Sequence, residues 1–447
     1  MYNYSCRKHI YQEVRVRPLT ERMNQAMKQE GQFRGLLLEE HDSCGIICTI
    51  EKNGVPSRSN IEKTLDALIK MEHRSGFIDG EGDGCGILTD IPRALWRRKL
   101  DEAGLNGDIV YNARFSVAHI FVPRNADRPA AELLQAMRER FADHGFHILL
   151  ERLDETNPAV LGPNGRKDEP SFWQVAGLAP SSENIGRALF ELHIELEQLY
   201  PVHVASFSSV TAVYKVMGSA SILREYFKDT QDPQFASQAT IGHNRYSTNT
   251  LSNFFRVQPF TLLGHNGEIN TIKKMRYEAD MIGVPLTEGG SDSQDMNRTI
   301  ETLIHRHGLT LFEAMDMMFP PIHNEIKLIR PELQDLYVYL RQIWGPFAQG
   351  PAAIVSRFGN ECLFSVDALG LRPLWMVEDE MSLYFSSEQG IVTVDEMVEE
   401  PKPIAPGEKI GVILHPGQPV EVVPYTKLQQ IVYDRASKRV DFSGMNR

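Results

Sequence analysis

The sequence predicts an α+β protein in which helices pack against antiparallel strands. Apolar or small residues fill every position from Cys44 to Ile50, a pattern typical of a strand buried on both faces. Residues 57–76 repeat apolar side chains at helical spacing, which indicates an amphipathic helix. Residues 350–392 alternate short apolar runs with turn residues and therefore predict the successive strands of β-hairpins.

Composition limits the classes of protein that this chain fits. With 447 residues, 42% of them hydrophobic, the chain can bury a large core and has the length of roughly two to three domains. Its net charge of -12 argues against nucleic acid and anionic membranes as partners, because both need clustered Lys and Arg. The N-terminus has no apolar export segment and no run of about 18 apolar residues occurs, so we expect a cytoplasmic protein that does not span a membrane.

The cysteines predict no metal or cluster site within this chain. They are Cys6, Cys44, Cys48, Cys85 and Cys362. No two of them form a C-x-x-C pair, the spacing that zinc ribbons and many iron-sulfur proteins use. A sparse, odd set of cysteines suits reduced thiols.

Residues 1–43 are predicted to be an appendage to the main domain. Their part "TERMNQAMKQEGQFRGLLLEE" is a short amphipathic helix with Thr20 as its cap, ending near Gly31 or Gly35. The strand that opens at Cys44 is expected to end at the turn pair Asn53–Gly54.

The stretch "SRSNIEKTLDALIKMEHRSG" is the clearest predicted helix. Ser59 and Glu62 have the spacing of a capping box, and Gly76 follows the expected end. One apolar stripe is expected to pack on a sheet: Ile61, Leu65, Leu68 and Ile69.

The stretch "DGEGDGCGIL" raises two binding alternatives, and neither fits. A phosphate loop would need a Gly-Lys-Ser/Thr ending, which is missing. A calcium loop running from Asp79 would have the wrong acids at its third and twelfth positions, and Pro92 suits a helix that begins after it. We therefore expect a glycine-rich turn into a strand from Ile87 to Thr89, with backbone lying close against backbone.

Helices and strands alternate between residues 110 and 215. We interpret about residues 110–200 as an α/β insertion, without repeats or low-complexity tracts. The expected order is strand "RFSVAHIFVP", helix "RPAAELLQAMRERFADHG", strand "HILLERL", polar loop "LGPNGRKDEP", helix "NIGRALFELHIELEQLY", and strands "VHVASFSS" and "TAVYKVM". After Pro424 the chain becomes polar and basic, so residues 425–447 are predicted to be a tail or linker.

An ordered set of motifs carries a resemblance to a known family. The motifs are "HDSCGI", "MEHRSG" with "GDGCGIL", "LGPNG", "SFSSVTAVYK", "NRYSTNT", "HNGEINT", "SDS" and "GLRP". Together they resemble the class II glutamine amidotransferase domain of glutamate synthase over about residues 36–420. The chain departs from the family pattern at Ser75, Cys85, Val216 and the "DALGLRP" turn from Asp367 to Pro373.

The resemblance implies a four-layer αββα sandwich of the N-terminal-nucleophile hydrolases, spanning residues 44–424. In such proteins a cysteine becomes the first residue of the mature chain, which here assigns Cys44 as nucleophile and residues 1–43 as a propeptide removed after Ser43. A free α-amino group titrates near about 7.7 to 8.0 and can serve as general base, whereas an amide nitrogen cannot. The alternative is that Cys44 is only a small buried core residue.

The resemblance also assigns groups that would bind glutamine. Asn266 and Gly267 of "HNGE" would stabilise the oxyanion of the tetrahedral intermediate, although Asn-Gly is also a common hairpin turn. Arg245 would hold the α-carboxylate and Asp292 the α-ammonium group. Neighbouring side chains expected to bind or orient these groups are Thr248, His243 and His265. Neither histidine has metal-ligand partners at a recognised spacing.

The fate of the ammonia remains open among three hypotheses. The first is a glutaminase that feeds a glutamate synthase partner, in which FMN and an iron-sulfur cluster would convert 2-oxoglutarate to glutamate. The second is a non-catalytic module with an internal Cys44, which binds glutamine or docks a partner. The third is an amidotransferase that serves a different acceptor. No cofactor is expected in this chain, which is interpreted as a separate subunit or a fragment.

Overall fold

The computed structural model describes residues 44–125, 128–246, 252–342 and 347–442. The helix expected between Thr20 and Glu40 lies outside these residues. Among the described residues, no helix combines the length and the hydropathy needed to cross a bilayer.

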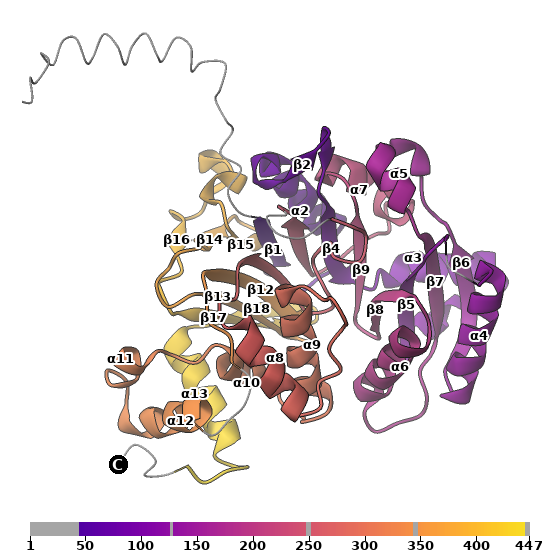
Figure 1. The fold of residues 1–447 in the computed structure, drawn as a ribbon. Helices are drawn as coiled ribbons and strands as arrows, with labels where there is room; N and C mark the ends of the chain where they lie inside the picture. Colours follow the sequence, from indigo (N-terminus) through magenta and orange to yellow (C-terminus); the bar gives the residue numbers. More distant parts are fainter. Residues whose placement is uncertain (1–43, 126–127, 247–251, 343–346, 443–447) are drawn as a thin grey trace, which may run out of the picture. The chain divides into compact units, whose positions relative to one another are not determined.

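A seven-stranded antiparallel sheet forms the first of two packed sheets (Figure 1). Its strand order is β16 (Lys402–Pro403), β14 (Trp375–Glu378), β15 (Ser382–Ser386), β1 (Gly45–Glu51), β10 (Ala239–Asn244), β4 (Cys85–Asp90) and β9 (Thr211–Val216). Strand β1 lies in the centre, pairs with β10 and β15, and is buried along its whole length. The prediction of a strand buried on both faces is therefore confirmed, and Cys44 is the residue that precedes it.

The second sheet has five antiparallel strands. Their order is β11 (Leu263–Gly267), β12 (Ala352–Phe358), β13 (Glu361–Val366), β17 (Lys409–His415) and β18 (Gln418–Val423). Strands β12 to β15 fall within residues 350–392, where the sequence predicts hairpin strands. The chain passes from one sheet to the other between β13 and β14.

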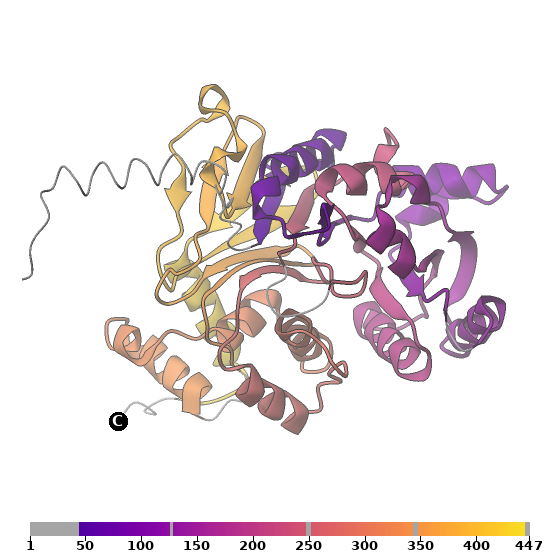
Figure 2. The ribbon, with the colours of Figure 1, turned by 45° about the horizontal axis from the view of Figure 1, so that its top comes forward.

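Three hydrophobic clusters show that the two sheets form the middle of a four-layer sandwich. The core between the sheets joins Ile46 and Ile241 of the first to Val355 and Phe364 of the second. A second cluster lies between the outer face of the seven-stranded sheet and α2, and a third between the outer face of the five-stranded sheet and α9, α10, α12 and α13 (Figures 1 and 2). The predicted four-layer αββα fold of class α+β is confirmed.

Twelve α-helices occur in the described residues. They are α2 (Arg58–Lys70), α3 (Arg93–Glu102), α4 (Ala130–Asp143), α5 (Pro163–Asp168), α6 (Ile185–Leu199), α7 (Ala220–Tyr226), α8 (Ile272–Met281), α9 (Asp292–His305), α10 (Leu311–Met318), α11 (His323–Ile326), α12 (Pro331–Gln342) and α13 (Tyr425–Ala436). Helix α2 buries Ile61, Leu65 and Leu68 as predicted. The expected capping box at Ser59 is wrong, because Ser57 caps the helix by accepting the N–H of Asn60 at 3.0 Å.

The segment interpreted as an insertion forms a sheet of its own. Its antiparallel strands are β6 (His147–Leu153), β7 (Ser171–Leu178), β5 (Phe115–Val122) and β8 (His203–Ser208). Helices α4 and α6 pack on it around a separate hydrophobic cluster. Strand β7, which lies between β6 and β5, was not predicted.

The glycine-rich turn packs as the sequence predicts, with backbone lying close against backbone. It contains the two-stranded ribbon β2 (Phe77–Ile78) and β3 (Glu81–Gly82) and leads into β4. A Cβ on Gly86 would lie 2.5 Å from the carbonyl oxygen of Gln258, and one on Gly84 would lie 2.4 Å from Val257. Residues 252–260, which we call the crossing segment, therefore need these glycines beneath them.

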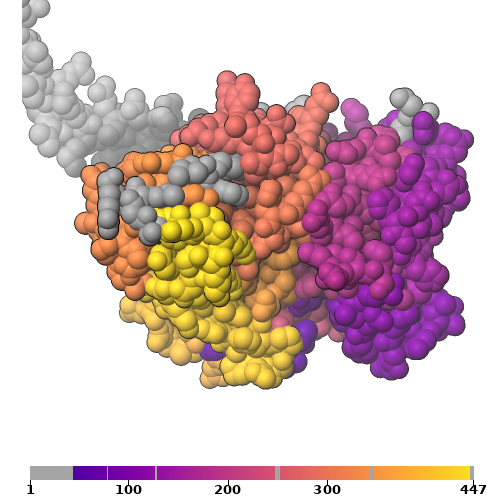
Figure 3. All heavy atoms as spheres, turned by 90° about the horizontal axis from the view of Figure 1, so that it is seen from below, coloured from indigo at the N-terminus to yellow at the C-terminus, as the bar shows by residue number. Residues whose placement is uncertain are grey.

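The prediction of a tail or linker from residue 425 is wrong for its first part. Residues Tyr425–Ala436 form α13, which buries Leu428 and Val432 against the helices below the five-stranded sheet. Figure 3 shows these yellow residues in contact with the orange residues of the preceding helices. Ala436 is buried in the same cluster, and the side chains that pack partly buried against it are Tyr425, Ile431 and Tyr433.

Candidate functional site

Cys44 lies half-buried at the head of β1, next to the residues that follow β10. Gly45 is opposite Asn244 in the β1–β10 register, so Cys44 meets the chain just after that strand ends. The N–H of Tyr246 donates to the Cys44 sulfur at 3.3 Å. Burial raises the pKa of the Cys44 thiol, while the Tyr246 N–H, Arg245 and Arg372 act in the opposite direction. A thiol with a raised pKa is protonated at neutral pH and needs a base to become a nucleophile.

A hydrogen bond between β10 and β11 joins the two sheets at this site. The Nε2–H of His243 donates to the carbonyl oxygen of His265 at 3.1 Å. Burial lowers the pKa of His243 to about 3, so the ring is neutral. Because Arg245 follows β10 and Asn266 follows His265, this bond brings the predicted carboxylate-binding and oxyanion-binding residues to adjoining strand ends.

The position of Arg245 is fixed by its main chain and its guanidinium group. Its N–H donates to the carbonyl of Gly84 at 2.8 Å, and its own carbonyl accepts the N–H of Gly76 at 3.0 Å. Its Nη1 donates to the carbonyl of Arg256 in the crossing segment at 2.7 Å. Only 6% of the residue is exposed. The guanidinium keeps its charge in this setting, since arginine is not deprotonated in proteins.

Asn266 has a buried side-chain amide that no described group satisfies. The residue is 1% exposed, and neither its Oδ1 nor its Nδ2 has a hydrogen-bond partner within the described part of the chain. The next residue, Gly267, has a φ of 138°, and a Cβ there would lie 1.8 Å from the carbonyl oxygen of Pro351. Buried amides are nearly always hydrogen-bonded, and the amide of Asn266 is free to donate a hydrogen bond to a water or a ligand or to accept one from it.

Asp292, the first residue of α9, is held at the end of β11. Its carboxylate accepts the N–H of Ile269 at 3.1 Å and the N–H of Ser293 at 2.7 Å. The Ser293 hydroxyl also contacts Asp292 at 3.2 Å and the Nδ1 of His265 at 2.9 Å. A carboxylate has about four acceptor positions, so Asp292 has capacity left for an ammonium group. His265 is neutral because burial lowers its pKa.

The structure adds Arg372, to which the sequence analysis assigned no role. Arg372 lies close enough to lower the pKa of the Cys44 thiol and, with burial, that of His265. Asp367 shapes the turn that carries it, by accepting the N–H groups of Ala352 at 3.2 Å, Leu369 at 3.0 Å, Leu371 at 3.0 Å and Arg372 at 3.2 Å. The signal in the sequence is the "GLRP" motif, which contains Arg372.

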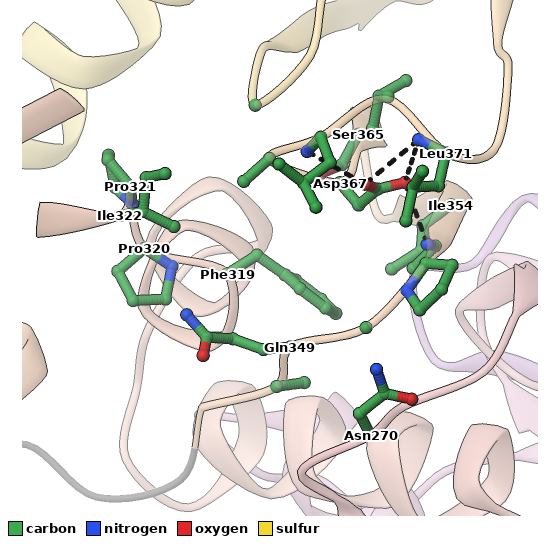
Figure 4. Close-up of a pocket in the computed structure, with 18 of the residues that line it drawn as sticks. Asn270, Phe319, Pro320, Pro321, Ile322, Gln349, Ile354, Ser365, Asp367 and Leu371 are labelled. Carbon is green, nitrogen blue, oxygen red and sulfur yellow. Dashed lines mark hydrogen bonds between the residues drawn. The ribbon is translucent and has the colours of Figure 1, made fainter. Parts of the chain in front are cut away.

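A cavity of about 450 Å³ lies beside the site and not at Cys44. Figure 4 shows it lined by apolar side chains such as Phe319 and Ile354, with the Asp367 turn along one edge. Pro351, whose carbonyl blocks a side chain at Gly267, also lines this cavity. None of the predicted site residues is among its lining residues.

Two of the sequence expectations about the site remain open. Thr248 lies outside the described residues, as does the junction between residues 43 and 44. Within the described residues, no group of three or more His, Cys, Asp or Glu side chains could hold a metal ion, and Cys44, Cys48, Cys85 and Cys362 are all free.

Comparison with known proteins places this arrangement in a family. Residues 44–432 match the family model "Glutamine amidotransferases class-II". The chain is 30% identical over 410 residues to ferredoxin-dependent glutamate synthase 2 of Synechocystis, covering 85% of this chain and 26% of that relative. It is 28% identical over 413 residues to the NADPH glutamate synthase large chain of Azospirillum brasilense, covering 85% and 27%.

The chain therefore spans about a quarter of the length of the curated relatives it matches. Among solved structures, the glutamine phosphoribosylpyrophosphate amidotransferase from B. subtilis matches with a TM-score of 0.30 and 15% identity, over 69% of this chain and 49% of that one. The match to the family model covers most of the chain and begins at Cys44, the residue before the central strand. This chain is an enzyme of the class II glutamine amidotransferase family.

Proposed function

We propose that this chain hydrolyses L-glutamine to glutamate and ammonia through a thioester on Cys44, and that it delivers the ammonia to a glutamate synthase-type partner acting on 2-oxoglutarate. The observation that carries the proposal is the position of Cys44 beside Arg245, with the unsatisfied amide of Asn266 on the adjoining strand. The thiol would attack the side-chain amide, and the unsatisfied buried amide would donate a hydrogen bond to the oxyanion that forms. The fixed cation would hold the α-carboxylate of the substrate.

The chemistry uses two steps at the same carbon. The Cys44 thiolate attacks the side-chain amide carbon of glutamine, and the oxyanion that forms accepts hydrogen bonds from the Asn266 amide and the Gly267 N–H. When the C=O bond re-forms, the C–N bond breaks and the nitrogen takes a proton and leaves as ammonia. Water then adds to the thioester, the C–S bond breaks, and glutamate and the free thiol result.

The base for these proton transfers is the α-amino group of Cys44, which exists only after residues 1–43 have been removed. An α-amine titrates near neutral pH, with a pKa of about 7.7 to 8.0 in model peptides. The raised pKa of the thiol makes a base of this kind necessary. The neutral histidines nearby are not proposed as bases. The ring of His243 donates a hydrogen bond to the His265 carbonyl and so holds the two strands together.

We therefore expect the active protein to begin at Cys44. Intact mass spectrometry of protein purified from its native host should give the mass of residues 44–447, together with glutaminase activity. A preparation with full activity and the mass of residues 1–447 would contradict the proposed base. Inactive protein of either length, in the presence of its partner, would favour a silent glutamine-binding module.

Arg245→Lys is expected to weaken glutamine binding more than it slows the reaction. The change keeps the charge but loses the planar fork that can hold a carboxylate with two hydrogen bonds. Since the α-carboxylate is bound alike in ground state and transition state, KM should rise by about tenfold or more with kcat within about threefold. Steady-state kinetics on correctly processed protein measure both. A fall in kcat with unchanged KM would remove Arg245 from the carboxylate site.

The partner and acceptor are proposed from the comparisons. The relatives described above are named glutamate synthases, and they are more than three times as long as this chain. FMN and an iron-sulfur cluster are expected on such a partner and not on this chain. Transfer of the amide ¹⁵N of glutamine to 2-oxoglutarate in the presence of the partner tests the delivery; transfer to another acceptor instead would contradict it.

A further inference from the structure

Lys215 is a buried lysine whose side-chain amine has no direct carboxylate partner in the described part of the chain. It lies on β9, where its side chain is fully buried. The other two buried lysines in the described residues each contact a carboxylate: Lys99 lies 2.5 Å from Asp229, and Lys409 lies 2.9 Å from Asp316. Lys215 instead contacts Nε2 of His203 at 2.8 Å and the carbonyl oxygen of Phe255 at 3.0 Å.

This placement is energetically unfavourable for a lysine and therefore needs a reason. Burying an ammonium ion is costly unless it is paired and hydrogen-bonded. Burial lowers the pKa of Lys215 to about 7, Glu197 acts in the opposite direction, and Arg245 lowers it further. An apolar side chain would fill this space at a lower energetic cost than a lysine. What a lysine adds is the pair of hydrogen bonds to His203 and Phe255.

On one side, Lys215 holds the crossing segment next to Arg245. The carbonyl of Phe255 accepts a hydrogen bond from Lys215 and has a longer contact of 3.5 Å with Gln294. The next carbonyl along the chain, that of Arg256, accepts a hydrogen bond from Nη1 of Arg245 at 2.7 Å. Two consecutive peptide groups are thus held by hydrogen bonds from the side chains of Lys215 and Arg245. The segment has little room to move toward β4, because Gly84 and Gly86 already lie against it without a Cβ.

On the other side, Lys215 connects to the helix that carries Asp292. Nδ1 of His203 lies 3.0 Å from Glu197 on α6, and Glu197 lies 2.6 Å from Arg298 on α9. Burial alone would raise the pKa of Glu197, but His193 and Arg298 hold it well below its ordinary value, so it is ionised. Because the ionised Glu197 accepts a hydrogen bond from Nδ1 of His203, Nε2 of the same ring is left as an acceptor for the Lys215 amine.

We propose that Lys215 is a positioning residue for glutamine recognition, which fixes the guanidinium of Arg245 through the adjacent carbonyls of Phe255 and Arg256. The inference rests on the proposed function, because it takes Arg245 as the group that binds the α-carboxylate. Lys215 touches neither the substrate nor the nucleophile in this role. Its loss should therefore act on binding, and only through Arg245.

The test measures the dissociation constant of L-glutamine by calorimetry in protein that begins at residue 44 and carries Cys44→Ala, where no turnover occurs. Adding Lys215→Met should weaken binding about tenfold, which corresponds to about 1.4 kcal/mol. Lys215→Arg, which restores a charged donor, should recover part of the loss. Lys99→Met is the matched control: it also removes a buried ammonium, but Asp229 keeps the side chains of Gln174 and Tyr214 as donors, and binding should not change.

A double mutant separates positioning from general destabilisation. If Lys215 acts through Arg245, then Lys215→Met should add less than about twofold once Arg245→Lys is present, whereas independent effects would multiply. Lys215→Gln serves in the same cycle if Lys215→Met does not fold, as judged by thermal melting. Unchanged binding in the Lys215 variants, or multiplicative losses, would overturn the inference. Absence of glutamine binding in the Cys44→Ala chain itself would instead contradict the proposed function.

Discussion

Cys44→Ala is expected to abolish glutamine hydrolysis and to leave glutamine binding intact. The substitution removes the sulfur that is proposed to bond to the substrate, and no other described thiol can replace it. Cys48, Cys85 and Cys362 are fully buried in the cores. The fold should survive, because Cys44 precedes β1 and contributes a half-buried side chain at its head. Ammonia release and calorimetry with L-glutamine measure the two effects on one preparation.

Cys85→Ala is the matched control for this experiment. Cys85 lies on β4, opposite Asn244, and therefore close to the same strand ends. Burial raises the pKa of its thiol well above the ordinary value, so it remains a protonated core residue. Activity near that of the wild type is expected for Cys85→Ala. Hydrolysis that persists in Cys44→Ala would remove Cys44 as nucleophile, whatever the control shows.

Patterns within short stretches of sequence predicted those strands, helices and turns whose structure depends mainly on neighbouring residues. The doubly apolar run after Cys44 is β1, and "HILLERL" is β6 with the bounds that the sequence suggested. The stripe on α2 and the close-packed glycines before β4 follow from spacing and from residue size. In each case the property that decides the structure lies within about ten neighbouring residues.

The missed elements depend on contacts from distant parts of the chain. Strand β7 is buried on both faces, by α4 and α6 on one side and by a separate core on the other, while its sequence alone resembles an ordinary apolar run after a loop. Ser59 has the better sequence spacing, but Ser57 caps α2. The backbone of Ser57 is held by its bridge to Ser237, and its hydroxyl accepts the N–H of Asn60. Helix α13 mixes apolar residues with charged and polar ones, and the core that its apolar face covers comes from helices more than 80 residues earlier in the chain.

The site shows the same division. Motifs identified Cys44, Arg245, Asn266 and Asp292, and the structure brings their strands and helix together, while their chemical roles remain predictions. Arg372 and Lys215 gain their interest only from what the fold places beside them. Lysine in the apolar run "TAVYKVM" was a visible signal, since a charged residue in a buried strand needs a partner.

Asn266→Ala is expected to lower kcat by about 10²- to 10³-fold with little change in KM. The Asn266 amide meets negative charge only when the tetrahedral oxyanion has formed, so its contribution is absent from the ground state. The same variant should be at least as stable as the wild type. Its amide has no partner in the described residues, and an unsatisfied buried polar group costs about 1–3 kcal/mol that alanine does not incur.

Asn297→Ala is the matched control, and we expect it to lower stability without lowering kcat. Asn297 is also a buried asparagine, on α9, but its amide is satisfied: Oδ1 accepts the N–H of Leu262 at 3.1 Å and Nδ2 donates to Thr261 at 2.8 Å. Its removal should lower the melting temperature and leave kcat nearly unchanged, since its side-chain hydrogen bonds go to Thr261 and Leu262 and not to a proposed site residue. Thermal melting and steady-state kinetics on both variants distinguish a group kept for structure from one kept for the transition state. If Asn266→Ala changed KM alone, or lost stability as Asn297→Ala does, its oxyanion role would have to be withdrawn.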